Sequence, residues 1–529
     1  MRGRKILPTA LSLALVLVLT LQPGCRDRGA NFTIALSDKF STLDPIGKES
    51  VDAAAERIRV LIFNSLVKKN EKFDYVPDLA STIERADDGM SYTFTLRDNV
   101  TFHNGLQLTS ADVKYTLDTV LASSSGKAAS FFEGSGPNKQ GFIKIIEAPD
   151  PLTVVIRLRK PWLSLLTNLV PIGIIPKDSA PSQENRPLGS GPFKFVSRDQ
   201  AQQIVSLEAY EEYWEGAPQV KKLFVRVIED GNALQAGLRS GGVTLAPLPT
   251  NLTPDAFKSL EKDGNLQVQA FTGANIVYLG FNVQNPPLDN VKLRQAIAYA
   301  IDRETLIREL LLGQAKAAHS ILPEESWAYA AGQAYSYDPA RAKQLLDEAG
   351  FRDPDGDGPQ MRLPKPIIFK ISSASVATRQ YVDVIRSYLN KVGIPVEIET
   401  MENNTLLAQL RQGSFQMTTS RWVGGNQDPI FLKDLFHSGE IPTETRASRN
   451  RSRYQNPEFD AIIDEAVNTA DREKSVALYR RAQEIISRDL PMIPLWYPAN
   501  MVVATKKVGN IKVDGSGDWG FVKSLTYTR

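Results

Sequence analysis

The amino-terminal segment constrains the fold most, because it predicts an exported protein whose body has no pair of cysteines for a disulfide. A positively charged start precedes an apolar stretch from Ile6 to Leu21, and this order is typical of a secretory signal peptide, which we place at residues 1–24. The stretch is shorter than the roughly twenty residues that a membrane-spanning helix needs. Cys25 is the chain's only cysteine. We therefore expect the exported body to be held together by its hydrophobic cores without disulfides.

The residues around Cys25 resemble a bacterial lipoprotein signal, in which cleavage occurs before a cysteine that then carries lipid. Gly24 supplies the small residue before the cut, but Gln22 stands three residues before the cysteine, where Leu is usual. The alternative is an ordinary cleaved signal with an incidental cysteine. The resemblance implies lipidation at Cys25, a linker at residues 25–29, and a periplasmic or extracytoplasmic body that meets the membrane through the lipid anchor only.

The composition predicts a large globular body. The chain has 529 residues, of which 42% are hydrophobic and 23% charged, and its 62 basic residues nearly balance 60 acidic ones. Single cores rarely grow past about 250–300 residues, so this length predicts two or three domains. The balanced charge gives no reason to expect a nucleic-acid partner.

The pattern of apolar residues predicts an α/β protein with mixed sheets. Early strands alternate apolar and polar residues, as in Tyr92 to Arg97. In the second half strands alternate with helices, which implies a parallel or mixed sheet with right-handed crossovers. The expected elements of this unit are a strand at 367–372, a helix at 378–392, a strand at 396–400, a helix at 405–411 and a strand at 415–420.

Three further helices have recognisable starting signals. Asp338-Pro339 and Asn456-Pro457 each combine a capping residue with proline at the first helical position. Asp289 is predicted to cap a helix whose apolar face includes Leu293 and Ile297.

The sequence gives little sign of catalysis. Its three histidines, His103, His319 and His437, are too far apart along the chain to suggest a local metal site. His103 comes just after a strand and beside Asn104-Gly105, which favours a turn histidine that bonds to the backbone. We therefore expect no catalytic residue, no metal and no cofactor.

One acidic stretch looks like the opening of a calcium-binding loop. Asp353, Asp355 and Asp357 alternate, and Gly358 falls at the turn position, but Pro364 stands where a bidentate Glu should follow. We favour an acidic, Gly-rich loop after the end of a helix. A bound calcium ion would be structural and peripheral.

The segment after the predicted strand at 415–420 is the best candidate for a binding site. Ligands of open α/β sheets lie outside the carboxyl ends of the strands. Trp422 offers a flat apolar surface there, Arg421 offers a guanidinium for a carboxylate, and Asn426 follows in the same loop. The alternative, that Trp422 fills the core between sheet and helix, is equally consistent with the sequence.

Taken together, an ordered series of short motifs resembles the extracellular solute-binding proteins of the peptide, dipeptide and nickel type, called family 5. Each motif is weak alone, but their order spans nearly the whole mature chain. The motifs are Leu43-Asp44-Pro45, Pro77-Asp78-Leu79-Ala80, Phe102-His103-Asn104-Gly105, Gly189-Ser190-Gly191-Pro192-Phe193, Tyr213-Trp214, Phe281-Asn282, Leu293-Arg294-Gln295-Ala296-Ile297, Asn456-Pro457 and Leu490-Pro491-Met492-Ile493-Pro494-Leu495.

The resemblance implies a two-lobe binding-protein (Venus-flytrap) fold in which two hinge strands join the lobes and an extra domain is inserted. The first lobe would comprise residues 30–72, 188–276 and 498–529. The inserted domain would be residues 73–187, and the second lobe residues 277–497.

The resemblance also implies a function. The chain would be the substrate-binding subunit of an ATP-binding-cassette importer, which captures a peptide or other small solute by hinge closure and delivers it, chemically unchanged, to permease and ATPase subunits. We expect a monomer that is not an enzyme. Two alternatives stay open, namely a lipoprotein receptor or sensor without its own permease, and a secreted hydrolase.

The resemblance is less complete for the individual residues that contact the ligand than for the motifs above. In the peptide-binding branch, the Trp is followed three residues later by an Asp that pairs with the free amine of the peptide; here Gly425 follows Trp422 at that spacing. Asp428-Pro429 matches a later pair, an acidic residue followed by proline, whose role in the family is chiefly structural. The amine partner is thus missing or supplied elsewhere, which argues against ordinary peptides. The candidate ligand contacts are Trp422, Arg421, Asn426, Asn282 and Phe40.

Overall fold

The structure, a computed structural model, describes residues 32–47, 52–133, 139–162, 164–356, 358–373, 376–424, 427–444, 448–469 and 471–528. The predicted signal peptide, the predicted lipidation site at Cys25 and the predicted linker at residues 25–29 lie outside this part of the chain. So do Gly425, Asn426 and Asp357. Within the described ranges, no helix is both long and apolar enough to cross a membrane.

A seven-stranded mixed sheet is built from both ends of the chain. Strand β1 pairs in parallel with β12 and β13, whereas the remaining neighbours are antiparallel. In spatial order the strands are β10 (Phe193–Asp199), β11 (Ile204–Ala209), β12 (Lys222–Val227), β1 (Phe32–Leu36), β13 (Leu245–Pro247), β21 (Asn500–Thr505) and β14 (Leu266–Phe271).

A second, six-stranded sheet contains the predicted α/β unit. Strand β17 pairs in parallel with β18 and β19, and the helices α10 (Val376–Lys391) and α11 (Asn403–Gln412) connect these strands, as the sequence predicts. In spatial order the strands are β16 (Ala315–Ala317), β20 (Met492–Pro498), β15 (Ile276–Phe281), β19 (Met417–Trp422), β17 (Ile367–Ser372) and β18 (Val396–Met401).

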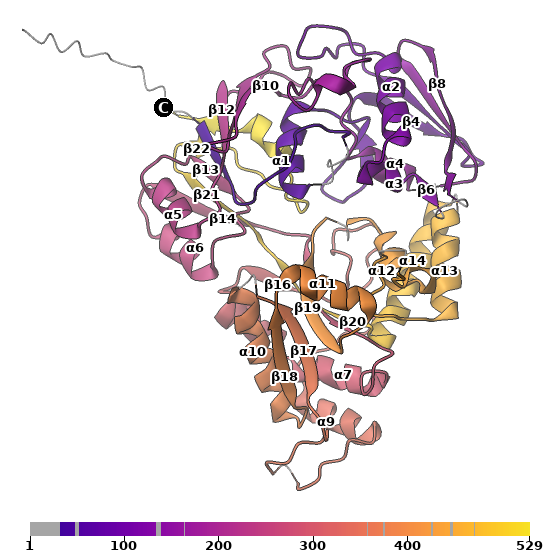
Figure 1. Cartoon of the computed structure of the whole chain (residues 1–529), viewed down its shortest axis with the longest axis vertical. Coiled ribbons are helices and arrows are strands. Elements are labelled where there is room, and N and C mark those ends of the chain that lie inside the picture. The colour runs from indigo at the N-terminus through magenta and orange to yellow at the C-terminus, as the bar shows by residue number, and fades with distance from the viewer. Residues whose placement is uncertain are drawn as a thin grey trace, which may run out of the picture. The chain divides into compact units, whose positions relative to one another are not determined.

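The chain passes between these two sheets twice. Residues 272–275 join β14 to β15, and Ala499 joins β20 to β21. We call the described residues of 32–271 and 500–528 the A lobe, and those of 276–498 the B lobe. Figure 1 shows the A-lobe elements above the B-lobe elements, with β14 and β21 leading down to the second sheet.

A third, four-stranded antiparallel sheet belongs to the A lobe. Helix α2 (Ser110–Ala122) packs on it, and buried residues of this sheet and of the seven-stranded sheet form one continuous apolar cluster. The strands are β4 (Ala80–Arg85), β5 (Ser91–Leu96), β9 (Thr153–Leu158) and β8 (Ile143–Asp150).

Helices cover both faces of the B-lobe sheet, so each face buries its own apolar cluster. On one face α7 and α10 pack against residues such as Leu279 and Phe369. On the other face α12, α13 and α14 pack against Ile276 and Tyr278. The bounds of these helices are Val291–Ala300 for α7, Phe431–Phe436 for α12, Pro457–Asn468 for α13 and Arg472–Asp489 for α14.

Two of the three predicted helix caps are confirmed. The side chains of Asp338 and Asn456 accept backbone hydrogen bonds at the starts of α9 (Pro339–Glu348) and α13. The cap predicted at Asp289 is wrong, because the side chain of Asn290 accepts a backbone N–H at 2.9 Å and begins α7. Asn caps a helix as well as Asp does, so the helix begins one residue later than predicted.

Arg294, the arginine of a family motif, joins α7 to the end of α14. Its side chain is buried, with 5% of the residue exposed. Nη1 donates to the carbonyl of Leu288 at 2.7 Å, and Nε donates to the carbonyls of Asp489 at 3.1 Å and Leu490 at 3.0 Å. Because α14 ends at Asp489, the guanidinium satisfies carbonyls at a helix C-terminus, where positive charge is favourable.

We predict that Arg294→Met lowers the free energy of unfolding by about 3 kcal/mol, because several buried carbonyls lose their donor. The matched control is Arg341→Met on α9, whose side chain is 39% exposed and pairs with Glu348, and it should cost less than about 0.5 kcal/mol. Urea unfolding followed by circular dichroism measures both. Equal midpoints for the two variants would contradict this structural role.

Candidate functional site

A large cavity lies where the A lobe faces the B lobe, with a volume of about 1200 Å³. The A lobe supplies most of the wall from three places: α1 (Ala53–Ile62), β2 (Val67–Lys69) and the carboxy-terminal segment 510–524. The other side contributes Asn275, Glu325, Val423, Gly424 and Gln427. Small-molecule pockets measure roughly 300–1,000 Å³, so this space suits a ligand larger than a single metabolite.

Polar residues, among them Asp78 and Tyr213 of the family motifs, form a fixed part of the cavity wall. The side-chain amide of Asn64 donates to Asp78 at 3.2 Å and to the hydroxyl of Tyr213 at 3.3 Å. Lys68 lies 3.1 Å from Glu215 and 3.5 Å from Asp78. Burial raises the pKa of Asp78, and the Lys68 charge acts in the opposite direction. These side chains hold one another in place, so this wall is preorganised.

The two lobes also touch through a hydroxyl–carboxylate cluster. The hydroxyls of Tyr75 and Thr167 in the A lobe both donate to the carboxylate of Asp428 in the B lobe. Tyr75 and Thr167 lie 2.7 Å apart, and the backbone N–H of Ile430 donates to the second Asp428 oxygen at 2.8 Å. Burial, followed by the Asp428 charge, raises the pKa of Tyr75, which therefore stays a donor. We call Tyr75, Thr167 and Asp428 the Asp428 latch.

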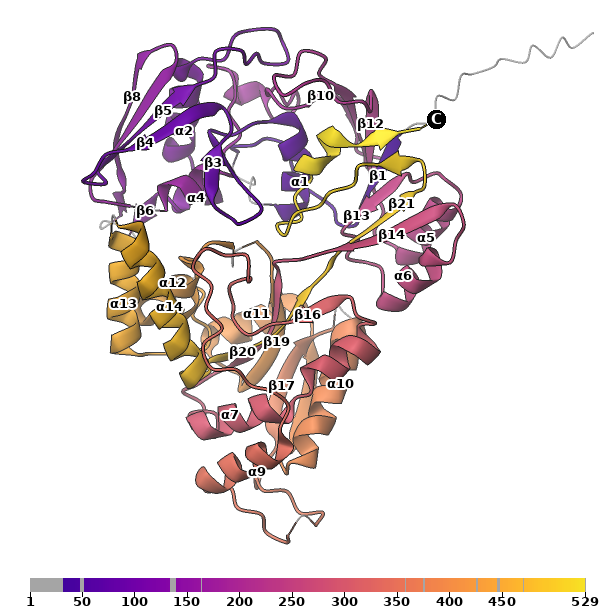
Figure 2. The same ribbon diagram turned by 180° about the vertical axis from the view of Figure 1, so that it is seen from behind.

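Two weaker contacts accompany the Asp428 latch. Arg472 pairs with Asp74 at 2.7 Å, and Lys69 donates to the Gln427 side chain at 3.4 Å. Figures 1 and 2 show that α12, α13 and α14 lie on the side of the molecule away from β14 and β21. The lobes are therefore joined covalently on one side and by these polar contacts on the other.

Trp422 lies inside β19, not after it. The strand predicted at 415–420 is displaced to Met417–Trp422, because Trp422 continues the antiparallel ladder opposite Ile276. Its ring stacks on Tyr278 with centroids 6.0 Å apart, meets the ring of Phe431 edge-on at 5.2 Å, and has the Arg451 guanidinium 5.3 Å from its centroid. Its neighbours Val423 and Gly424, and not Trp422, line the cavity.

The structure does not bring the other predicted contacts together. Strands β15 and β19 run antiparallel, so Asn282 lies beyond the end of β15 opposite Met417, at the far end of β19 from Trp422. Asn282 is 4% exposed and donates to the carbonyl of Gly413 at 2.8 Å. Phe40 is buried beneath the guanidinium of Arg198, which lies 4.3 Å from its ring centroid. Arg421 is exposed, and Asn426 lies outside the described residues.

Sequence reasoning missed most of the cavity wall. The carboxy-terminal segment lines it through Asp514, Gly515, Ser516, Gly517 and Asp518. A Gly- and Ser-rich stretch between acidic residues is a turn signal that indicates a surface loop. Nothing local, however, reveals that this loop faces helix α1, which lies at the other end of the sequence.

The histidines occupy separate, structural places. The prediction for His103 is confirmed, because Nε2 lies 3.0 Å from the carbonyl oxygen of Gly191. Burial lowers the pKa of His103 to about 4. His437 lies 3.3 Å from Asp464. Among the described residues, no group of three or more His, Cys, Asp or Glu side chains is placed to hold a metal ion.

In the described part of the acidic stretch, residues 353–356 and 358, the Asp353 carboxylate bonds to neighbouring groups of the protein. Asp353 accepts backbone hydrogen bonds from Asp355 at 3.1 Å and Gly356 at 2.9 Å, and pairs with Arg362 at 3.1 Å. These contacts favour the acidic-loop interpretation over a calcium site.

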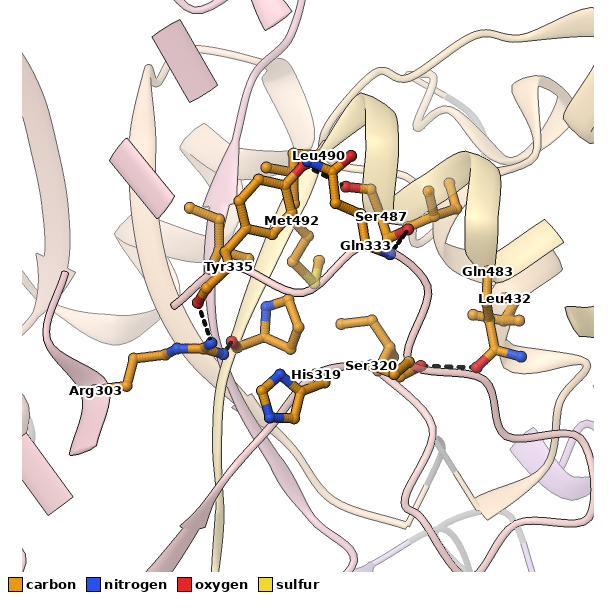
Figure 3. Close-up of a pocket in the computed structure, with 15 residues that line it drawn as sticks. Arg303, His319, Ser320, Gln333, Tyr335, Leu432, Gln483, Ser487, Leu490 and Met492 are labelled. Atoms are coloured by element: carbon orange, nitrogen blue, oxygen red, sulfur yellow. Dashed lines mark hydrogen bonds between the residues drawn. The ribbon is translucent and has the colours of Figure 1, made fainter. Parts of the chain in front are cut away.

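A much smaller cavity lies inside the B lobe and contains His319 (Figure 3). Its volume of about 30 Å³ holds no more than about two water molecules. The polar groups around it bond to one another, as Arg303 does to the carbonyl of Tyr335 at 2.7 Å and Ser320 to Gln483 at 2.7 Å. It is therefore too small for a solute.

Comparison with known proteins places the chain among solute-binding proteins. The profile described as "Bacterial extracellular solute-binding proteins, family 5 Middle" matches residues 74–442. Heme-binding protein A of Haemophilus influenzae is 31% identical over 476 residues, which cover 84% of this chain and 83% of that protein. Oligopeptide-binding protein AppA of Bacillus subtilis is 29% identical over 484 residues, which cover 88% and 86%. The solved structure of that AppA with a nonapeptide matches with a TM-score of 0.72 at 26% identity, covering 94% of this chain and 99% of that one.

We predict that Tyr75→Phe combined with Thr167→Val lets the lobes separate. A hydrogen bond to a charged group is worth about 1.5–3 kcal/mol, so losing two of them should raise the open population at least about tenfold. Small-angle X-ray scattering would report a larger radius of gyration. The control is Tyr115→Phe on α2, which lies within the A lobe and should leave the curve unchanged. Identical curves for the double variant and the parent would show that the Asp428 latch does not hold the lobes.

Proposed function

The chain belongs to family 5 of the bacterial extracellular solute-binding proteins, and we propose that it captures a peptide or peptide-like solute between its lobes and delivers it to an ATP-binding-cassette importer. The observation that carries this proposal is the cavity of about 1200 Å³, which is lined by residues of both lobes. Proteins named for binding oligopeptides and heme are among its relatives. The volume of the cavity supports a ligand of about the size of an oligopeptide or a heme.

The proposed mechanism is closure of the lobes around the solute. A solute shifts the lobes toward the closed form only as far as it binds that form more tightly. The wall built from Asn64, Asp78 and Tyr213 is fixed in the A lobe, so binding need not order it. Val423, Gly424 and Gln427 then complete the contacts from the B lobe. The permease would recognise the closed arrangement.

We also propose the features that accompany this function. Residues 1–24 would be removed as a signal peptide, and Cys25 would carry the lipid that holds the body at the extracytoplasmic face. The first lobe would comprise residues 30–72, 188–276 and 498–529, the insert 73–187 and the second lobe 277–497. The protein would act as a monomer without cofactor and would leave the solute chemically unaltered. Trp422, Arg421, Asn426, Asn282 and Phe40 stay predictions as solute contacts, although Trp422, Arg421, Asn282 and Phe40 are not among the residues that line the cavity.

Mass spectrometry of compounds that copurify with the protein from its native host tests the proposal most directly. A retained peptide or peptide-like compound that shrinks the radius of gyration on re-addition is the expected result. Turnover of that compound would favour the secreted hydrolase instead. The absence of neighbouring permease and ATPase genes would favour the receptor or sensor.

We predict weak binding of simple dipeptides and tripeptides, because Gly425 stands where the peptide-binding branch has the carboxylate partner of the ligand amine. Gly425→Asp should raise the affinity for trialanine about tenfold or more, since it supplies that partner. Acetyl-trialanine, which has no free amine, is the matched control and should gain nothing. Titration calorimetry measures both. Submicromolar binding of trialanine to the unaltered protein would contradict the prediction.

A further inference from the structure

The side-chain amide of Asn500 joins both crossings to the loop that lines the cavity. Asn500 follows Ala499 directly and is 3% exposed. Its Nδ2 donates to the carbonyl of Asp514 at 2.9 Å and reaches the carbonyls of Thr272 and Gly515 at 3.3 Å. Thr272 belongs to the first crossing, and all three carbonyl residues line the cavity. One buried amide thus bonds a crossing to the cavity wall of the A lobe.

Neighbouring residues of the first crossing are bonded to opposite lobes. The backbone N–H of Ala274, which is fully buried, donates to the carbonyl of Gly515 in the A lobe at 2.9 Å. The next residue, Asn275, is 5% exposed, and its side-chain oxygen accepts from the backbone N–H of Gly424 in the B lobe at 3.1 Å. Gly424 lines the cavity from that lobe. The bonding therefore changes from one lobe to the other between Ala274 and Asn275.

The second crossing changes lobes in the same way. The backbone N–H of Ala499 donates to the carbonyl of Gln314 in the B lobe at 3.0 Å. The next residue, Asn500, pairs with Phe271 in the ladder between β21 and β14, so it belongs to the A lobe. The bonding here changes between Ala499 and Asn500.

The two crossings are in close contact at Gly273. A Cβ at this position would lie 2.0 Å from the carbonyl oxygen of Pro498, so a residue with a side chain would push the two backbones apart. Hinges absorb changes of φ and ψ at a few residues. Because residues 272–274 are bonded to the A lobe and packed against the other crossing, rotation is left to the steps that follow Ala274 and Ala499.

We propose that Asn500 is a positioning residue, which fixes the places where the chain turns as the lobes close. By holding Thr272 and the loop at 514–515 in one body, it confines the rotation to the steps 274–275 and 499–500. This inference rests on the proposed closure of the lobes and adds the residue that directs it. A solute that touches Gly515 on one wall and Gly424 on the other then contacts residues that are bonded to the two sides of a single step.

Hydrogen exchange of single amides tests where the first crossing turns. Asn500→Leu nearly keeps the volume of the side chain and removes its donor. Exchange of the Ala274 amide should become about tenfold faster or more, because its acceptor Gly515 is no longer held by the Asn500 amide. The Gly424 amide, on the other side of the step, should keep its rate. Mass spectrometry with electron-transfer fragmentation resolves the two amides, and acceleration of both or of neither would overturn the proposal.

Small-angle X-ray scattering tests the role of Asn500 in closure. A second turning point adds open arrangements of the lobes, so Asn500→Leu should increase the radius of gyration. The matched control is Asn251→Leu, which removes a side-chain amide that donates to the carbonyls of Ile228 at 2.8 Å and Glu229 at 3.0 Å within the A lobe. This control should leave the scattering curve unchanged, because these bonds lie away from the crossings.

A second variant acts on the crossings without removing the amide, so it decides the question independently of how well Asn500→Leu folds. Gly273→Ala pushes against Pro498 and should also increase the radius of gyration, whereas Gly264→Ala, where a Cβ meets nothing within 4 Å, should not. An unchanged curve for either Asn500→Leu or Gly273→Ala would overturn the directing role of Asn500 while solute capture stands. Failure of the copurified compounds to bind the unaltered protein would overturn solute capture instead.

Discussion

Two short backbone crossings are the constraint on which the rest of the structure depends. Within the described ranges, residues 272–275 and Ala499 are the places where the chain passes between the A lobe and the B lobe. Each lobe buries its own apolar clusters, so a rotation about the crossings disturbs little of either core. The free energy of closure is therefore set by the polar groups on the facing surfaces and by whatever fills the cavity between them.

The facing groups described above attract one another. Tyr75 and Thr167 meet Asp428 with complementary hydrogen bonds, and Arg472 pairs with Asp74. A solute that binds to both lobes adds to these contacts. Surfaces between domains are commonly more polar than cores, which suits a contact that forms and breaks repeatedly. Specificity and closure thus depend on the same small group of side chains.

Features that depend on nearby residues could be predicted from the sequence. The α/β unit follows from local periodicity, and the caps at Asp338 and Asn456 follow from residue type. The site could not be assembled in this way, because it depends on pairing between distant segments. Asp428 and Tyr75 are 353 residues apart in sequence, and the antiparallel register of β15 and β19 separates Asn282 from Trp422. Sequence reasoning selects Arg421 from its place near a strand end, but Arg421 is not among the residues that line the cavity.

The composition of the Asp428 latch has a consequence for cargo release. All of its groups belong to the protein, so it favours the closed form by the same amount whether the cavity is full or empty. A stronger contact would raise apparent affinity by populating the binding-competent form, yet it would lengthen the dwell time of the cargo to the same degree. Unloading at the membrane therefore sets an upper limit on its strength. Two neutral hydroxyls on one carboxylate form a weaker contact than a buried ion pair, so they respect that limit better.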